Sequence, residues 1–324
     1  MAQEKTTKTQ IKTSAEYFKK EFKKEIAENI ELANRKTGFA NIDEKQIFNA
    51  GLYVVGATPA CGKTTFCWQL LNQLAENGES CIYCSYEMSR LELYSKSVSS
   101  KLFQRVGETA LTAADIRRGV WNTTVNEIVE ELQKPLELKV IELSTETIDD
   151  LLELLKALIK KSKRPPIVCV DYLQIIPSEK EGIKQSIDDI VHKLKIFQRQ
   201  TNTTFIIVSS FNRTNYNLPA YFESFKESGS IEYSADVIWA MQPKFLNEIV
   251  RKTATNEIRE RMAMHNQQTP REIQIKCLKN RNGNLYDVYF NYYSAHDYFE
   301  STEDEEDYYI SRRRRMKYDN DYCD

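Results

Sequence analysis

A lysine and two threonines at residues 63–65 follow a short loop that ends in glycine. The loop joins an apolar run, LYVVG, to a helical stretch, TFCWQLLNQLAENG, which is the context in which a phosphate-binding Walker A loop works. Gly62 should let the backbone close around phosphate, with amides at the helix start as donors. Lys63 should reach the β- and γ-phosphates, and Thr64 should bind magnesium. The nucleotide contacts that we predict are Ala57, Thr58, Pro59, Ala60, Cys61, Gly62, Lys63, Thr64 and Thr65.

A second apolar run, PIVCV, leads into Asp171, which is the form of a Walker B strand. Its carboxylate should hold the magnesium ion through water. The next residue is Tyr172, which cannot act as a general base, so the base must come from another strand. Glu87 ends the run CIYCSYE and is the candidate, because the carboxyl ends of parallel strands gather around the ligand. An ordinary exposed glutamate is the alternative interpretation of Glu87.

Short β-rich runs alternate with helical stretches from residue 51 onward, which predicts an α/β fold with a mostly parallel, twisted sheet covered by helices on both faces. This is the architecture of a P-loop nucleotide-binding core. Residues 243–270 form a polar, helix-prone insertion before the last strands. The runs are LYVVG, CIYCSY, LKVIEL, PIVCVDY, TFIIVSS, DVIWAMQ, REIQIKCL and LYDVYF.

Residues 12–36 predict an amphipathic helix that precedes the first strand of the core. Thr13 and Glu16 have the spacing of a capping box. One face of the helix is apolar and needs a partner, so the helix packs either on its own domain or on a neighbouring subunit. The residues themselves favour neither. The apolar face consists of Ala15, Phe18, Phe22, Ile26 and Ile30.

Length and composition indicate a globular, cytoplasmic protein. The 324 residues are 41% apolar, and no apolar run approaches the ~20 residues needed to span a bilayer. The seven cysteines are typical of reduced core residues. Cys81 and Cys84 lie in one strand with side chains on opposite faces, which disfavours a shared zinc ion. A net charge of −2 means that any contact with DNA must be local.

The segments with candidate chemistry occur in the order found in one family. Together they resemble the C-terminal, RecA-like ATPase domain of the DnaB-type hexameric replicative DNA helicases over roughly residues 37–290. The resemblance implies a homohexameric ring around single-stranded DNA, with ATP and Mg²⁺ bound between subunits. The matching segments are Thr37–Phe39 with Ile42 and Asp43, the Walker A loop, Ser85–Ser89, Asp171–Gln174, Ser209–Arg213, Lys226–Glu232 with Ala235 and Asp236, and Lys279–Gly283.

The resemblance also implies roles for residues outside the Walker motifs. Lys279 and Arg281 reach the γ-phosphate of the neighbouring subunit, although Arg281 as a surface residue beside a turn is the alternative. The first helix becomes a linker that packs on the next subunit. The loops after Asp171 and Arg213 line the channel, and their candidate DNA contacts are Lys180, Lys184, Arg213 and Lys226, with Tyr216 and Tyr221 available for stacking.

The domain boundaries that follow are a linker helix at 1–36, the ATPase domain at 37–298 and a charged tail at 299–324. The tail, with an acidic block at 303–307 and four arginines at 312–315, is expected to be disordered. Because only about fifty residues precede the first strand, we expect the family's N-terminal domain to be absent from this chain. A loader or primase would then be a separate protein, which fits a mobile-element replication protein.

Three positions depart from the family pattern. The glutamine that senses the γ-phosphate is Ser210, which is too short to reach it in the same way. A glycine of the phosphate loop is Ala60, and an arginine before Glu-Ser-Gly is Lys226. Ser210 puts the coupling of hydrolysis to movement in doubt more than it does ATP binding.

Three functions therefore compete. The first is an ATP-driven ring helicase or translocase in DNA replication. The second is a RecA-like recombination or repair ATPase that forms filaments, against which the Glu-Ser-Gly-Ser-Ile-Glu segment and the Lys-x-Arg spacing argue. The third is a weakly hydrolysing assembly or loading module that uses ATP as a switch, and Ser210 keeps it open.

Overall fold

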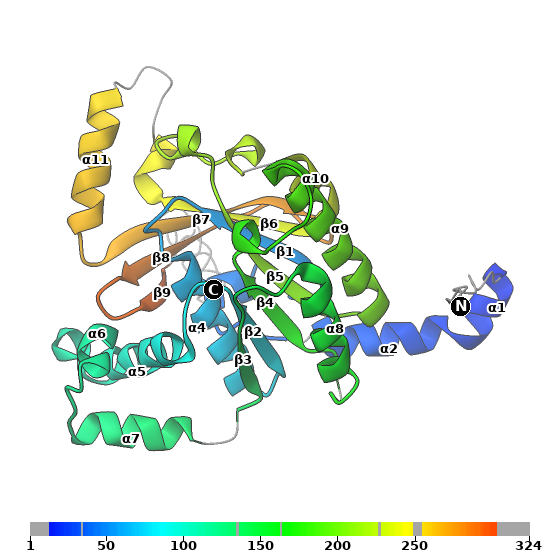
Figure 1. Ribbon diagram of the computed structural model, residues 1–324, viewed down its shortest axis with the longest axis horizontal. Helices are drawn as coiled ribbons and strands as arrows, with labels where there is room; N and C mark the ends of the chain where they lie inside the picture. The colour runs from blue at the N-terminus through cyan, green and yellow to red at the C-terminus, as the bar shows by residue number, and fades with distance from the viewer. Residues whose placement is uncertain are drawn as a thin grey trace, which may run out of the picture.

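The computed structural model describes residues 13–33, 35–133, 136–162, 164–225, 228–248 and 255–302. Within these residues the strands form one sheet in the order β3-β2-β4-β5-β1-β6-β7-β8-β9 (Figure 1). The strands are β1 (Gly51–Ala57), β2 (Cys81–Ser85), β3 (Leu138–Glu142), β4 (Ile167–Asp171), β5 (Thr204–Ser210), β6 (Val237–Pro243), β7 (Arg271–Asn280), β8 (Asp287–Tyr293) and β9 (Tyr298–Thr302).

Strands β1 to β6 pair in parallel. Beyond β6 the sheet continues with β7, β8 and β9, each antiparallel to the strand before it. Strands β1, β2, β4 and β6 are buried along their whole length, which explains their nearly continuous apolar sequences. The predicted mostly parallel sheet is confirmed. The sheet runs through Thr302, so the domain boundary placed at residue 298 falls on the first residue of β9.

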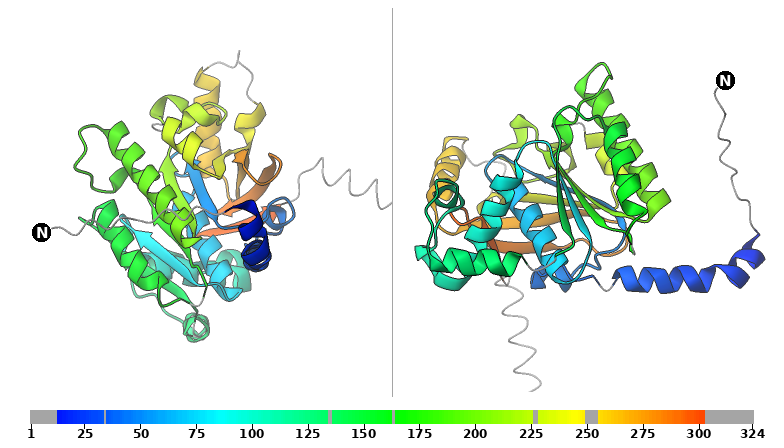
Figure 2. Two further views of the ribbon diagram at one scale, coloured as in Figure 1. Left: turned by 90° about the vertical axis from the view of Figure 1, so that its right-hand side faces the viewer. Right: turned by 60° about the horizontal axis from the view of Figure 1, so that its bottom comes forward.

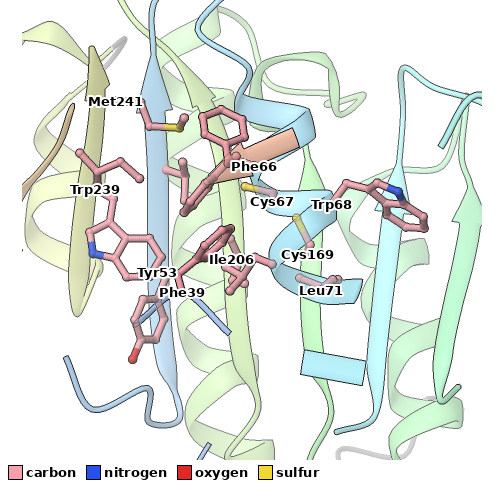
Figure 3. Packing of buried hydrophobic residues seen from close by; sticks show 14 of the residues in the cluster. Phe39, Tyr53, Phe66, Cys67, Trp68, Leu71, Cys169, Ile206, Trp239 and Met241 are labelled. Atoms are coloured by element: carbon pink, nitrogen blue, oxygen red, sulfur yellow. The ribbon is translucent and has the colours of Figure 1, made fainter. Parts of the chain in front are cut away.

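Helices cover both faces of the sheet and create two apolar cores (Figure 1). One core packs α4 (Lys63–Glu76) against Tyr53, Trp239 and Ile206, as Figure 3 shows. The other packs α8 (Ile148–Ile159) and α9 (Ile183–Thr201) against the opposite face. Cys81 and Cys84 belong to different cores, as the period of a strand requires.

Besides α4, α8 and α9, the described chain after Arg35 contains six more α-helices, three of which pack together. Helices α5, α6 and α7 enclose a small apolar core of their own beside α4. Helix α11 confirms the helical character predicted for the insertion. None of these helices combines the length and apolar composition that crossing a membrane requires. Their bounds are α3 (Ala40–Asp43), α5 (Arg90–Val106), α6 (Ala113–Arg117), α7 (Thr123–Leu132), α10 (Ser228–Ser234) and α11 (Thr255–Gln267).

The N-terminal segment forms two helices, α1 (Ser14–Lys20) and α2 (Phe22–Ala33), that project from the rest of the chain (Figure 2). The predicted capping box is present, because the Thr13 hydroxyl accepts from the Glu16 amide and Glu16 accepts from Thr13. The single helix that the pattern predicts is interrupted at Glu21. The apolar face is uncovered, with Phe18 60% exposed and Ile30 56% exposed.

Arg35 fixes the chain to the sheet directly after this segment. Its buried guanidinium donates to the Glu79 carboxylate at 3.0 Å, to the Thr204 hydroxyl at 2.8 Å and to the Pro165 carbonyl at 2.7 Å. These contacts join three segments near the amino ends of the strands. The base of α2 is therefore anchored while its apolar face stays free within the described chain.

Candidate nucleotide-binding site

The loop between β1 and α4 depends on two residues with positive φ. Gly62 caps α4 at φ +81°, and a Cβ atom there would lie 2.8 Å from ring atoms of Phe299 and Tyr292. Only glycine meets both conditions. Ala60 has φ +65°, where a residue with a Cβ atom loses roughly 1–2 kcal/mol. Ala60 stands where the family has glycine, so the backbone keeps the glycine conformation although the side chain has changed.

Lys63 is the first residue of α4, and its side chain folds back over this loop. Its ammonium donates to the carbonyls of Ala57 at 3.2 Å and Thr58 at 3.3 Å, which are two of the predicted nucleotide contacts. Burial lowers the pKa of Lys63, and the nearby Asp171 carboxylate opposes this effect. A phosphate group arriving at the loop would offer this partly desolvated cation a stronger partner than two carbonyls.

Thr64 and Asp171 meet at the carboxyl edge of the sheet. The Thr64 hydroxyl donates to Asp171 Oδ2 at 2.7 Å, and the Tyr83 hydroxyl donates to the same oxygen at 2.7 Å. Asp171 is 1% exposed, and burial raises the pKa of its carboxyl group. In the described part of the chain Asp171 Oδ1 has no hydrogen-bond partner. A buried, unpartnered carboxylate oxygen beside a hydroxyl fits Mg²⁺ with its water ligands.

Glu87 follows β2, the strand that pairs with β4. Ser85 lies opposite Asp171 in this pairing, and the Tyr86 amide donates to the Asp171 carbonyl at 2.9 Å. Glu87 therefore lies just beyond the level of Asp171 and is largely exposed. Partial burial and then the Asp171 carboxylate raise the pKa of Glu87, while Lys63 lowers it. Its carboxylate thus shares the electrostatic environment of the loop lysine and the strand aspartate.

Lys279 and Arg281 lie at the opposite edge of the sheet from Lys63. Ala57 pairs with Met241 and Met241 with Ile275, whereas Lys279 pairs with Ile238. Lys279 is thus four residues, or about 13 Å, further along β7 than the level of the phosphate loop. The structure does not bring either residue to the nucleotide loop of its own chain.

Both cations have partners at that edge. Lys279 donates to the Glu232 carbonyl at 2.5 Å, and Arg281 lies 3.0 Å from an oxygen of the Asp236 carboxylate. Asp236 also accepts from Lys195 and from the Leu52 amide. The Arg281 side chain is 54% exposed, so it lies at the surface while Asp236 holds it.

The candidate DNA contacts that the structure describes follow two adjacent strands, and their side chains are exposed. Lys180 lies in the loop after β4, and Arg213 lies in a short 3-10 turn after β5. Lys184, predicted in the first loop, belongs to the first turn of α9. Gln174, just after β4, is joined to the end of β5, because it donates to the Ser209 hydroxyl at 2.8 Å and accepts from the Ser210 amide at 3.2 Å. Lys226 falls outside the described residues.

Two contacts of the site are not predicted by the sequence. Tyr83 forms part of a strand pattern, and its hydroxyl bond to Asp171 depends on which strands are neighbours. Arg271 donates to the Ala60 carbonyl at 3.3 Å and so braces the strained residue of the loop. A tyrosine inside an otherwise apolar strand is the available signal for Tyr83, whereas nothing local marks Arg271.

The fold, with the phosphate loop between β1 and α4, is that of a RecA-like P-loop domain. The family model described as the DnaB-like helicase C terminal domain matches residues 35–301, and the chain belongs to this family. The replicative DNA helicase DnaB of Haemophilus influenzae is 26% identical over 211 residues, which cover 62% of this chain and 44% of that protein. The DnaB of Helicobacter pylori strain 26695 is 24% identical over 289 residues, covering 81% and 58%.

Other comparisons agree on the family and the fold. A protein described as a probable plasmid replicative DNA helicase, from Chlamydia muridarum, is 23% identical and covers 62% of this chain and 45% of its own length. The chain spans about half the length of the curated relatives it matches.

Among solved structures, one described as an ATPase domain has a TM-score of 0.72 at 17% identity, covering 91% of this chain and all of that one. A DnaB-like replicative helicase studied with primase has a TM-score of 0.70 at 17% identity, covering 88% and 68%.

Proposed function

We propose that this chain is the ATP-hydrolysing motor of a DnaB-type replicative DNA helicase and moves along single-stranded DNA as a homohexameric ring. One observation carries the proposal. The carboxyl edge of the sheet carries Lys63, Thr64, Asp171 and Glu87. The two cations that the resemblance assigns to the γ-phosphate, Lys279 and Arg281, lie at the opposite edge. A complete site therefore needs two copies of the chain.

The proposed division of labour follows from the chemistry of each group. Lys63 and the amides at the start of α4 bind the phosphates of ATP. Thr64 binds Mg²⁺ directly and Asp171 binds it through water. Glu87 orients and polarises the attacking water, since its exposed carboxylate lies within the electrostatic influence of Lys63 and Asp171. Lys279 and Arg281 leave their partners at Glu232 and Asp236 to stabilise charge on the neighbour's γ-phosphate.

Assembly of the ring is assigned to the N-terminal linker at residues 1–36. Among the described residues nothing covers the apolar face of α1 and α2, and Arg35 anchors the point where the linker meets the ATPase domain. A second copy of the chain is the partner that completes both the apolar face and the ATP site. Of the tail predicted at residues 299–324, residues 299–302 belong to β9, and residues 303–324 have no role in this proposal.

DNA binding is assigned to the channel loops. Lys180, Lys184 and Arg213 are exposed cations that follow adjacent strands, and we assign Lys226, which lies outside the described residues, to the same role. Because the whole chain carries a net charge of −2, these local cations must supply most of the attraction for phosphate. One solved structure is of a DnaB-like replicative helicase and its interactions with primase, and we propose a separate primase or loader as a partner of this chain as well.

The decisive experiment measures ATP hydrolysis with and without single-stranded DNA, together with unwinding of a forked duplex. Stimulation by DNA and loss of hydrolysis in Lys63→Ala and Glu87→Gln support the motor. Without stimulation and unwinding the proposal fails, and the ATP-switched assembly module, which Ser210 favours, takes its place. Filaments instead of closed rings in electron micrographs would favour a recombination ATPase.

A further inference from the structure

We propose that the Tyr83 hydroxyl is a positioning group for the magnesium site, which holds the Asp171 carboxylate so that Oδ1 faces the ion and its water ligands. The inference rests on the proposed function, because it assumes that the loop binds ATP with Mg²⁺. It adds a residue outside the Walker motifs to the machinery of the site.

The two carboxylate oxygens of Asp171 differ in their hydrogen bonds. Oδ2 accepts from the Tyr83 and Thr64 hydroxyls, each at 2.7 Å, and these two bonds occupy its lone pairs. Oδ1 is buried and has no partner within the described residues. Buried polar atoms without partners are rare and require an explanation. A metal-bound water that donates to Oδ1 provides one.

The same arrangement prepares Thr64 for the ion. Its hydroxyl hydrogen is committed to Asp171 Oδ2, so the lone pairs of Thr64 Oγ1 remain free to bind a cation. Tyr83 and Thr64 approach Oδ2 from different elements, β2 and the start of α4. The carboxylate is thus fixed from two directions before any ion arrives, which lowers the cost of organising the site.

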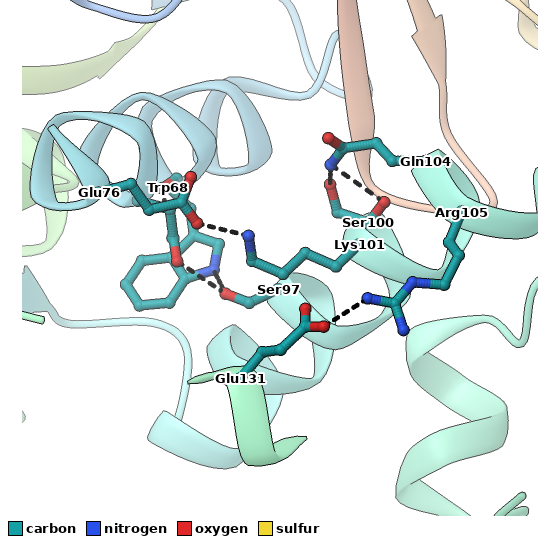
Figure 4. Close-up of polar contacts among 9 residues, drawn as sticks. Trp68, Glu76, Ser97, Ser100, Lys101, Gln104, Arg105 and Glu131 are labelled. Atoms are coloured by element: carbon teal, nitrogen blue, oxygen red, sulfur yellow. Dashed lines mark hydrogen bonds and ion pairs between the residues drawn. The ribbon is translucent and has the colours of Figure 1, made fainter. Parts of the chain in front are cut away.

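Packing leaves Tyr83 little freedom to place its hydroxyl elsewhere. Its side chain is fully buried, and its ring meets Trp68 edge to face at a centroid distance of 5.2 Å. The Trp68 indole donates to the Ser97 hydroxyl at 2.8 Å, as Figure 4 shows, and Ser97 donates to Asn72 at 3.1 Å. Residues of α4 and α5 therefore fix the position of the Tyr83 ring, and the Tyr83 hydroxyl in turn fixes the Asp171 carboxylate.

A purely structural role for the hydroxyl is the competing explanation, since any buried tyrosine needs an acceptor. The two explanations differ in what Tyr83→Phe does. Loss of a structural bond lowers stability only. Loss of a positioning bond weakens metal binding in protein that remains folded.

The test measures binding of Mn²⁺, as a paramagnetic substitute for Mg²⁺, to the full chain with ADP by electron paramagnetic resonance. We expect Tyr83→Phe to weaken Mn²⁺ binding roughly tenfold, the scale of effect seen when a group that orients a metal ligand is removed. ADP binding in the presence of a chelator should stay unchanged. Mn²⁺ affinity within twofold of the wild type in folded Tyr83→Phe would overturn the inference.

The matched control is Tyr53→Phe, which removes the hydroxyl of another buried tyrosine in the same core, at the opposite end of β1 from the loop. It should lose stability without losing Mn²⁺ affinity. If Tyr83→Phe does not fold, p-aminophenylalanine at position 83 keeps a donor in place. That variant should bind Mn²⁺ within about threefold of the wild type, and a tenfold loss would contradict the proposal.

These measurements need neither DNA nor hydrolysis. Failure of the helicase proposal would appear as absent stimulation by DNA, whereas failure of this inference would appear as an unchanged metal affinity. The two outcomes are therefore distinguishable.

Discussion

Gln69 on α4 and Phe299 on β9 exchange two buried hydrogen bonds. The Gln69 side chain donates to the Phe299 carbonyl at 2.8 Å and accepts from the Phe299 amide at 2.7 Å. The Phe299 ring stacks on the Tyr292 ring with their centroids 4.2 Å apart, and both rings lie directly against Gly62. The last strand of the sheet thus packs against the loop before α4, so β9 belongs to the same domain as that loop.

Gly62→Ala should abolish nucleotide binding and lower the free energy of unfolding by about 2–4 kcal/mol, because a Cβ atom meets both rings and φ is positive. Gly78→Ala is the matched control, since Gly78 has φ +88° with open space around the Cβ position. It should lose only about 1–2 kcal/mol and keep ATP binding. Urea unfolding and fluorescent nucleotide titration measure both. Equal effects of the two substitutions would refute the packing argument.

Ala60→Gly should stabilise the protein. The left-handed conformation of Ala60 costs more than the extra freedom that glycine gains in the unfolded chain, which leaves about 0.5–1 kcal/mol in favour of glycine. Thermal unfolding of the nucleotide-free protein tests whether Ala60→Gly raises the unfolding temperature. A lower unfolding temperature for Ala60→Gly would mean that contacts of the methyl group outweigh the backbone strain.

The double substitution Ile26→Ser and Ile30→Ser should prevent ring assembly without unfolding the ATPase domain. Both side chains are exposed on their own chain, so the free energy of unfolding of the single chain should change by no more than about 0.5 kcal/mol. Light scattering measures the mass of the assembly, and circular dichroism the stability. Exposed residues Glu28 and Glu31 of the same helix provide the control pair, as serine variants. Assembly that survives the isoleucine changes would show that the linker packs on its own domain.

The parallel part of the sheet could be predicted from the sequence because strands buried on both faces have to be apolar throughout, as LYVVG and IVCVD are. The same pattern locates the site residues. Asp171 ends such a strand, and Lys63 and Thr64 begin the helix after the loop that follows another. Because the predicted strands are parallel, their carboxyl ends lie at one edge of the sheet. These residues are therefore predicted to meet at that edge.

The remaining features depend on contacts between distant segments. The Tyr83 bond to Asp171 exists because β2 pairs with β4, and no local pattern encodes that register. The support of Gly62 by Phe299 joins the start of the domain to its last strand. The break at Glu21 was hidden because the apolar spacing continues across it. The prediction of a disordered tail was wrong for residues 299–302, which form part of β9. Lys226 and residues 303–324 lie outside the described residues and stay predictions.

The central claim is that Lys63 of one subunit and Arg281 of its neighbour form one ATP site. ATP hydrolysis by mixtures of the Lys63→Ala and Arg281→Ala proteins tests it most directly. Each variant alone should be inactive, and an equal mixture should recover up to about a quarter of the wild-type rate, because one interface in four then pairs an intact loop with an intact arginine. Mixing Arg281→Ala with the Lys63→Ala, Arg281→Ala double variant should recover nothing. A mixture of the single variants that stays as inactive as its components, in rings shown to exchange subunits, would contradict the shared site.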